Sequence, residues 1–144
     1  MILDIAMVAF VLLELSNVII LYFKPEFTYG NSMAVFKGWE HAKTEEKSYL
    51  YSKYLVHWVA NTKLIFIFLL TTIVLTGNET IKVAGVCVTL VSIGVYFLTL
   101  FPIIKRLDAL GEITPKGYSK TLSLMIGGFM ILFFTALVLH FIFE

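Results

Sequence analysis

Hydrophobic positions along the chain fall into four long runs that are separated by polar segments. The runs cover residues 2–23, 54–76, 81–104 and 119–143. A helix rises about 1.5 Å per residue, so each run is long enough to cross a hydrocarbon core of about 30 Å. The pattern therefore predicts an all-α integral membrane protein, a single domain over residues 1–144 with four antiparallel transmembrane helices in a bundle.

Local signals in the polar segments predict where these helices begin and end. Pro25 disfavours helix at the residue before it, so the first helix ends there. Thr44 precedes two acidic residues and predicts a side-chain cap at the start of the second helix. Gly77 and Asn78 predict the end of that helix and a tight turn. Residues 32–39 fit a short interfacial helix and an irregular loop equally well.

Composition indicates a membrane protein, and the distribution of charge predicts its orientation in the membrane. Hydrophobic residues make up 59% and charged residues 15% of the chain, against about 45–50% and about 25% in soluble domains. Basic residues concentrate in segments 24–53 and 105–118, and Lys120 lies just after the second segment. The opposite side of the membrane carries only Lys82. Basic loops face the cytoplasm, so both loops are predicted to be cytoplasmic and both termini extracytoplasmic, in a multi-pass protein of the cell (cytoplasmic) membrane.

Polar side chains inside the first two spans mark a candidate intramembrane site. Its members are Glu14, Asn17, His57, Asn61 and Lys63. A lysine at mid-depth costs roughly 2.5–3.5 kcal/mol on insertion scales, so such groups need partners or a polar interior. Glu14 and Lys63 each lie nine residues from the cytoplasmic end of their span, a depth of about 13 Å. They either form an ion pair, or Lys63 extends alone toward the headgroups.

Helical angles divide the polar residues of the second span. His57 and Asn61 share one face, whereas Lys63 is rotated about 160° from Asn61 at 100° per residue. If Lys63 pairs with Glu14, we expect His57 and Asn61 to face the third or fourth span. The alternative is a cavity lined by Glu14, Asn17 and the pair His57 and Asn61, with Lys63 outside it.

Other chemistry has little support in the sequence. The three histidines are predicted to lie at different depths, and no paired-cysteine or His-Glu-x-x-His motif occurs. We therefore expect no metal and no cofactor, and we identify no catalytic residue. The single cysteine, Cys87, reads as a small packing residue. Phosphate-binding loops, hydrolase elbows and signals for nucleic-acid binding are absent.

These patterns leave three classes of function open. The first is a small transporter or channel-like protein in which Glu14 titrates or pairs with a cation while Asn17, His57 and Asn61 line the path. The second is a non-transporting accessory or assembly protein whose buried polar residues specify helix packing. The third is a membrane enzyme acting on lipid or quinone headgroups near His57. Membrane lipids and a second copy of the chain are the expected partners, and the substrate stays undetermined.

Overall fold

The computed structural model describes residues 1–27 and 31–143, and in these residues the protein consists of helices joined by turns and loops, with no β-strand. The long helices are α1 (Ile2–Phe23), α3 (Glu46–Thr76), α4 (Glu79–Ala109) and α5 (Tyr118–Phe143), and each is long and apolar enough to cross a membrane. Two short elements, η1 (Met33–Val35) and α2 (Lys37–Ala42), lie between α1 and α3. The prediction of an all-helical chain compatible with a multi-pass membrane protein is confirmed.

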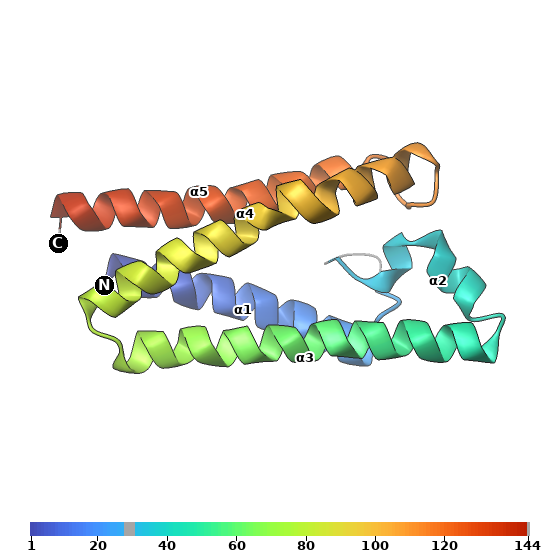
Figure 1. Ribbon diagram of the computed structural model, residues 1–144, viewed down its shortest axis with the longest axis horizontal. Helices are drawn as coiled ribbons and strands as arrows, with labels where there is room; N and C mark the ends of the chain where they lie inside the picture. Colours follow the sequence, from blue (N-terminus) through green and yellow to red (C-terminus); the bar gives the residue numbers. More distant parts are fainter. Residues whose placement is uncertain (28–30, 144) are drawn as a thin grey trace.

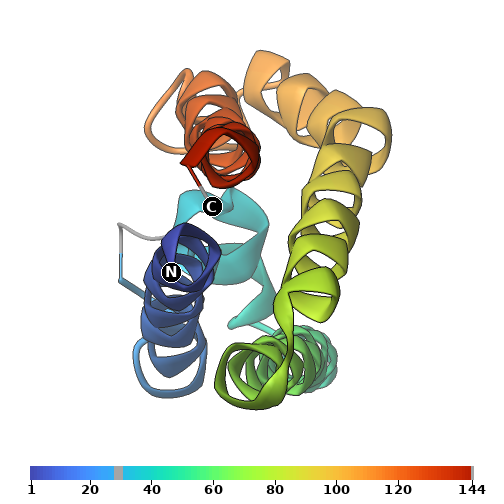
Figure 2. The ribbon, with the colours of Figure 1, turned by 90° about the vertical axis from the view of Figure 1, so that its left-hand side faces the viewer.

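The helices lie side by side along one long axis, and their two ends differ in character (Figure 1). Both termini and the α3–α4 turn lie at one end, the terminal end, while α2 and the α4–α5 connection lie at the other, the loop end. Helix α1 packs against α3 and α5, and α4 packs against α5. Helices α3 and α4 diverge with distance from the turn that joins them. At the loop end α4 therefore packs against α5 rather than α3 (Figures 1 and 2).

Aliphatic and aromatic side chains form the contacts between these helices. Near the terminal end, Met7, Phe10 and Phe133 are buried together with residues of α3 and α4. Closer to the loop end, Val18 of α1 packs with Ala60 of α3. Helix α4 is the least buried of the four, with 6% of its most apolar stretch inside the protein against 28% for α1. Most of the apolar surface of α4 therefore faces outward or into the hollow described below.

Polar contacts close the loop end and hold the start of α5. The Lys37 amide donates to the Glu112 carbonyl at 3.0 Å, and the Thr114 amide donates to the Val35 carbonyl at 2.8 Å. The buried carboxylate of Asp108 accepts hydrogen bonds from the Gly117 amide at 2.9 Å and from the Ser119 amide and hydroxyl at 3.1 and 2.6 Å. This satisfies amides at the N-terminus of α5 that have no partner within the helix.

Several local expectations need correction. Thr44 does not cap α3: its hydroxyl donates to the His41 carbonyl, and Glu45 precedes the helix without a side-chain cap. Residues 32–39 contain both η1 and the start of α2, while residues 28–30 of the same loop lie outside the described chain. Cys87 is exposed on α4 and is therefore not a buried packing residue.

Gly77 permits the tight α3–α4 turn through close approach of backbone. A Cβ at Gly77 would lie 2.5 Å from the Ile73 carbonyl oxygen, which accepts the Gly77 amide hydrogen bond. We expect Gly77→Ala to lower the free energy of unfolding by about 1–3 kcal/mol, because the helix end must shift to relieve the overlap. Thermal unfolding in detergent measures the effect. Gly127→Ala is the control, since a Cβ there meets nothing within 4 Å, and equal stability of the two variants contradicts the prediction.

Candidate functional site

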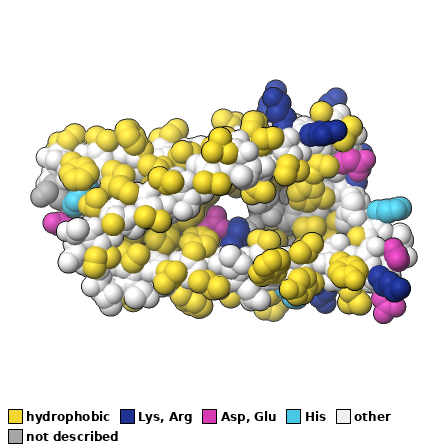
Figure 3. Space-filling view, viewed as in Figure 1, with side chains coloured by type: hydrophobic (Ala, Val, Ile, Leu, Met, Phe, Trp, Pro, Cys, Tyr) yellow, Lys and Arg dark blue, Asp and Glu magenta, His cyan; other side chains and the backbone are white. Residues whose placement is uncertain are grey.

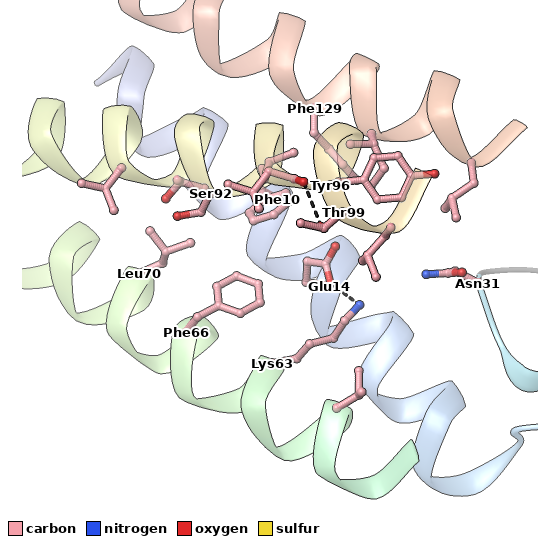
Figure 4. Close-up of a pocket in the computed structure, with 18 of the residues that line it drawn as sticks. Phe10, Glu14, Asn31, Lys63, Phe66, Leu70, Ser92, Tyr96, Thr99 and Phe129 are labelled. Carbon is pink, nitrogen blue, oxygen red and sulfur yellow. Dashed lines mark hydrogen bonds and ion pairs between the residues drawn. The ribbon is translucent and has the colours of Figure 1, made fainter. Parts of the chain in front are cut away.

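A half-buried ion pair lies on the contact between α1 and α3. The Lys63 ammonium donates to Glu14 Oε2 at 2.7 Å and to Asn17 Oδ1 at 2.6 Å. The Glu14 and Lys63 side chains are 15% and 22% exposed, and Figure 4 shows them pointing toward each other from their helices. We name Glu14, Asn17 and Lys63 the charged cluster.

The sequence brings these residues together because they lie at nearly equal distances from the terminal end of two neighbouring helices, Glu14 12 residues from Ile2 and Lys63 13 residues from Thr76. Glu14 and Asn17 are one turn apart on α1 and share a face, so both reach the ammonium of Lys63. The ion pair anticipated from depth is therefore present, and the alternative in which Lys63 extends alone toward the headgroups is wrong. The functional role of the pair stays a prediction.

The charged cluster lies on the wall of a large hollow between α3 and α4. The hollow has a volume of about 970 Å³ and is lined mostly by apolar side chains of these two helices, with Phe10 and Glu14 from α1 and Phe129 from α5. Figure 3 shows it as an opening through the middle of the molecule with one basic and one acidic side chain visible inside. Its volume falls at the upper end of the range for small-molecule sites, about 300–1,000 Å³.

A second, smaller cavity of about 320 Å³ adjoins the charged cluster on the side of the loop end. It lies between α1, α3 and the loop before η1, and its polar lining residues include Asn17, Ser32 and Ser52. Lys63 and Asn31 line both cavities. Lys63 therefore stands where the apolar hollow meets a more polar space leading toward the loop end.

The other two predicted site residues lie apart from both cavities. The Tyr22 hydroxyl of α1 donates to Asn61 Oδ1, and the Tyr22 ring packs edge-on against His57 with centroids 5.2 Å apart. The expectation that His57 and Asn61 face the third or fourth span is wrong, as is the alternative of one cavity that includes them. The α1-facing stripe of α3 runs through Ala60, and at 100° per residue Lys63 and Asn61 flank it on opposite sides. Helix α1 therefore contacts both Lys63 and Asn61.

Sequence reasoning missed several polar residues. Asp4, in the first turn of α1, pairs with Lys82 of α4 at 2.6 Å. Tyr22 gives no distinct signal in the sequence, because tyrosine is common at the ends of membrane spans. The Tyr96 hydroxyl is buried on the wall of the hollow and has no hydrogen-bond partner among the described residues. A lone tyrosine deep in an apolar run was the one available signal for it.

Outside the membrane-length helices, a surface cluster forms at the loop end. Lys43 pairs with Glu40 at 2.8 Å and with Glu26 at 3.0 Å. The two carboxylates raise the pKa of Lys43, Glu40 having the larger effect. The ammonium therefore stays charged at physiological pH, and the cluster ties the loop after α1 to α2.

Within residues 1–27 and 31–143, no group of three or more His, Cys, Asp or Glu side chains is arranged to hold a metal ion. Comparison of the chain with protein-family models, curated proteins and solved structures gives no match. Function is therefore inferred from the geometry of the charged cluster and the two cavities.

Proposed function

We propose that this protein is a small membrane transporter of the carrier type, whose intramembrane binding site is the charged cluster of Glu14, Asn17 and Lys63. In this proposal the chain is an antiparallel four-helix bundle in the cytoplasmic membrane, with the terminal end outside and the basic loop end in the cytoplasm. The distribution of Lys and Arg supports this orientation.

The observation that carries the proposal is the position of Lys63 on the wall shared by two cavities. An ion pair that served packing alone would be enclosed by close-packed side chains, because protein interiors contain few voids larger than a water molecule. Here the pair borders a hollow of about 970 Å³ on one side and, on the other, a cavity of about 320 Å³ that has Ser32 and Ser52 in its lining. A ligand could therefore contact the pair from one cavity and leave through the other.

The remaining polar residues have supporting roles in this proposal. Tyr22, His57 and Asn61 join α1 to α3 beside the charged cluster, and interhelical hydrogen bonds in membranes average about 0.6 kcal/mol. They hold the two helices in register so that Glu14 and Lys63 meet. Two copies of the chain could also associate through the exposed face of α4, which would enclose the hollow further.

A non-transporting accessory protein is the second candidate, and one observation favours it. Lys63 bonds directly to both Glu14 and Asn17 across two helices, as residues that only specify helix packing would do. In that role the hollow is filled by lipid or by a partner helix and nothing moves through the protein.

Flux measurements in proteoliposomes separate the two candidates. The probes are pyranine for protons and nitrobenzoxadiazole-labelled diacylglycerol and phosphatidylcholine for exchange between leaflets. We expect at least one probe to move about tenfold faster than in empty vesicles, and Glu14→Gln to remove most of that gain because it breaks the ion pair at the site. Glu46→Gln, an exposed carboxylate on α3, is the matched control. Flux equal to that of empty vesicles for every probe rejects transport and favours the accessory role.

A further inference from the structure

We infer that the hollow between α3 and α4 binds an amphiphile with an uncharged hydroxyl or carbonyl headgroup and a long apolar tail. The inference deepens the proposed function by naming its ligand class, and it concerns binding rather than movement. Three features of the described residues carry it: the apolar lining, the zero net charge of the site, and the hydrogen-bonding capacity left on Glu14 and Lys63.

The lining of the hollow matches an apolar tail. From Lys63 toward the terminal end it is formed by the apolar residues Phe66, Leu70 and Ile73 of α3, opposite Ala84 and Val88 of α4. The rise of α3 from Lys63 to Ile73 is about 15 Å, so the apolar part extends well beyond a headgroup. Figure 4 shows Phe66 and Leu70 on one side of the ion pair and Asn31 on the other.

The charge of the site selects an uncharged headgroup. Glu14 and Lys63 are the charged residues among the described side chains that line the two cavities, and they pair at 2.7 Å. Their charges cancel, so the site has no net charge with which to compensate a charged ligand. Burying an unpaired charge costs several kcal/mol in proteins, whereas a hydroxyl or carbonyl needs only hydrogen-bond partners.

Those hydrogen-bond partners exist beside the ion pair. A lysine ammonium has three N–H donors, and those of Lys63 meet two acceptors, on Glu14 and Asn17. One N–H donor of Lys63 and the second carboxylate oxygen of Glu14 have no partner among the described residues. A ligand hydroxyl could accept from the first and donate to the second, while a carbonyl could accept from the first.

The route into the hollow is sideways, from the bilayer. Lining residues on both of its flanking helices are exposed: Leu69 on α3 is 61% exposed, and Val88 and Leu100 on α4 are 66% and 59% exposed. The opening between α3 and α4 in Figure 3 lies on the long side of the molecule rather than at an end. An amphiphile dissolved in the membrane therefore reaches the charged cluster without leaving the apolar phase.

Three probes with one sixteen-carbon chain and different headgroups test the inference: hexadecanol, hexadecyl sulfate and hexadecyltrimethylammonium. Their binding to the full chain in phosphatidylcholine nanodiscs is measured by native mass spectrometry. We expect saturable binding of one hexadecanol per chain, about tenfold or more tighter than either charged probe. Glu14→Gln leaves the Lys63 charge uncompensated, and we expect it to reverse the preference in favour of hexadecyl sulfate. Glu46→Gln leaves the preference unchanged.

The wild-type ranking decides the question even where Glu14→Gln does not fold. Equal binding of the neutral and anionic probes, or non-saturable uptake of all three, overturns the inference. The outcome is separable from that of the flux experiment. Hexadecanol bound selectively in a protein that moves no flux probe rejects transport alone, whereas Glu14-dependent flux without selective hexadecanol binding rejects this ligand class alone.

Discussion

Replacing Lys63 by methionine is expected to lower the free energy of unfolding by about 3–5 kcal/mol, because the substitution leaves the Glu14 carboxylate half-buried without its cation. Methionine retains most of the length of the lysine stem, so the loss reflects charge more than packing. Asn17 loses the same hydrogen-bond donor. Titration with dodecyl sulfate in mixed micelles measures the effect.

A double-mutant cycle separates the ion pair from general destabilisation. Glu14→Leu combined with Lys63→Met replaces both charges by apolar groups, which is often neutral or stabilising relative to a buried pair. We expect the double variant to recover most of the stability lost in Lys63→Met. Lys53→Met, at an exposed position on the same helix, should change stability by less than about 0.5 kcal/mol. A double variant as unstable as the sum of the single variants would show that the two side chains are not coupled.

Replacing Val88 by tryptophan is expected to weaken hexadecanol binding more than tenfold, with little change in stability. Val88 lies on α4, is 66% exposed and lines the hollow opposite α3. A tryptophan there fills space that the apolar tail of a ligand would occupy, and it meets no close-packed core that must move. Native mass spectrometry gives the affinity, and thermal unfolding gives the stability.

Val91 provides a matched control for this substitution. It lies one turn further along α4 and is 70% exposed, but it is not part of the hollow's lining. Val91→Trp adds the same bulk to the same helix, so we expect affinity within about twofold of wild type, a difference well under 1 kcal/mol. If both tryptophan variants weaken binding equally, the ligand does not occupy the space between α3 and α4.

Helix positions could be predicted from the sequence because apolar run length and a few terminal residues determine them. The run that begins at Ile2 ends at Phe23, two residues before Pro25, and α3 begins within one residue of the position predicted from the acidic pair after Thr44. The cap on α3 could not be predicted, since the Thr44 hydroxyl had a competing acceptor in the His41 carbonyl. Local propensity identifies a boundary more reliably than the bond that forms there.

The same reasoning found the meeting of Glu14 and Lys63 but misplaced His57 and Asn61. Equal depth on consecutive helices is a property of the sequence, and it brought the two charges together. The sequence does not determine which neighbouring helix covers the side of α3 that carries Lys63 and which covers the side that carries Asn61. A rotation of 160° suggests two different neighbours, yet α1 lies between the flanks, and Tyr22 reaches one while Glu14 reaches the other.

By itself the sequence determined an all-helical chain with four membrane-length helices and a charged pair at matched depth, because these depend on residue type and spacing along one helix. Only the tertiary structure decided that α4 packs on α5 and diverges from α3. Packing between helices depends on the shapes of whole faces, and many arrangements bury similar apolar area. That divergence opens the hollow beside Lys63, and with it the site on which the proposed ligand and transport depend.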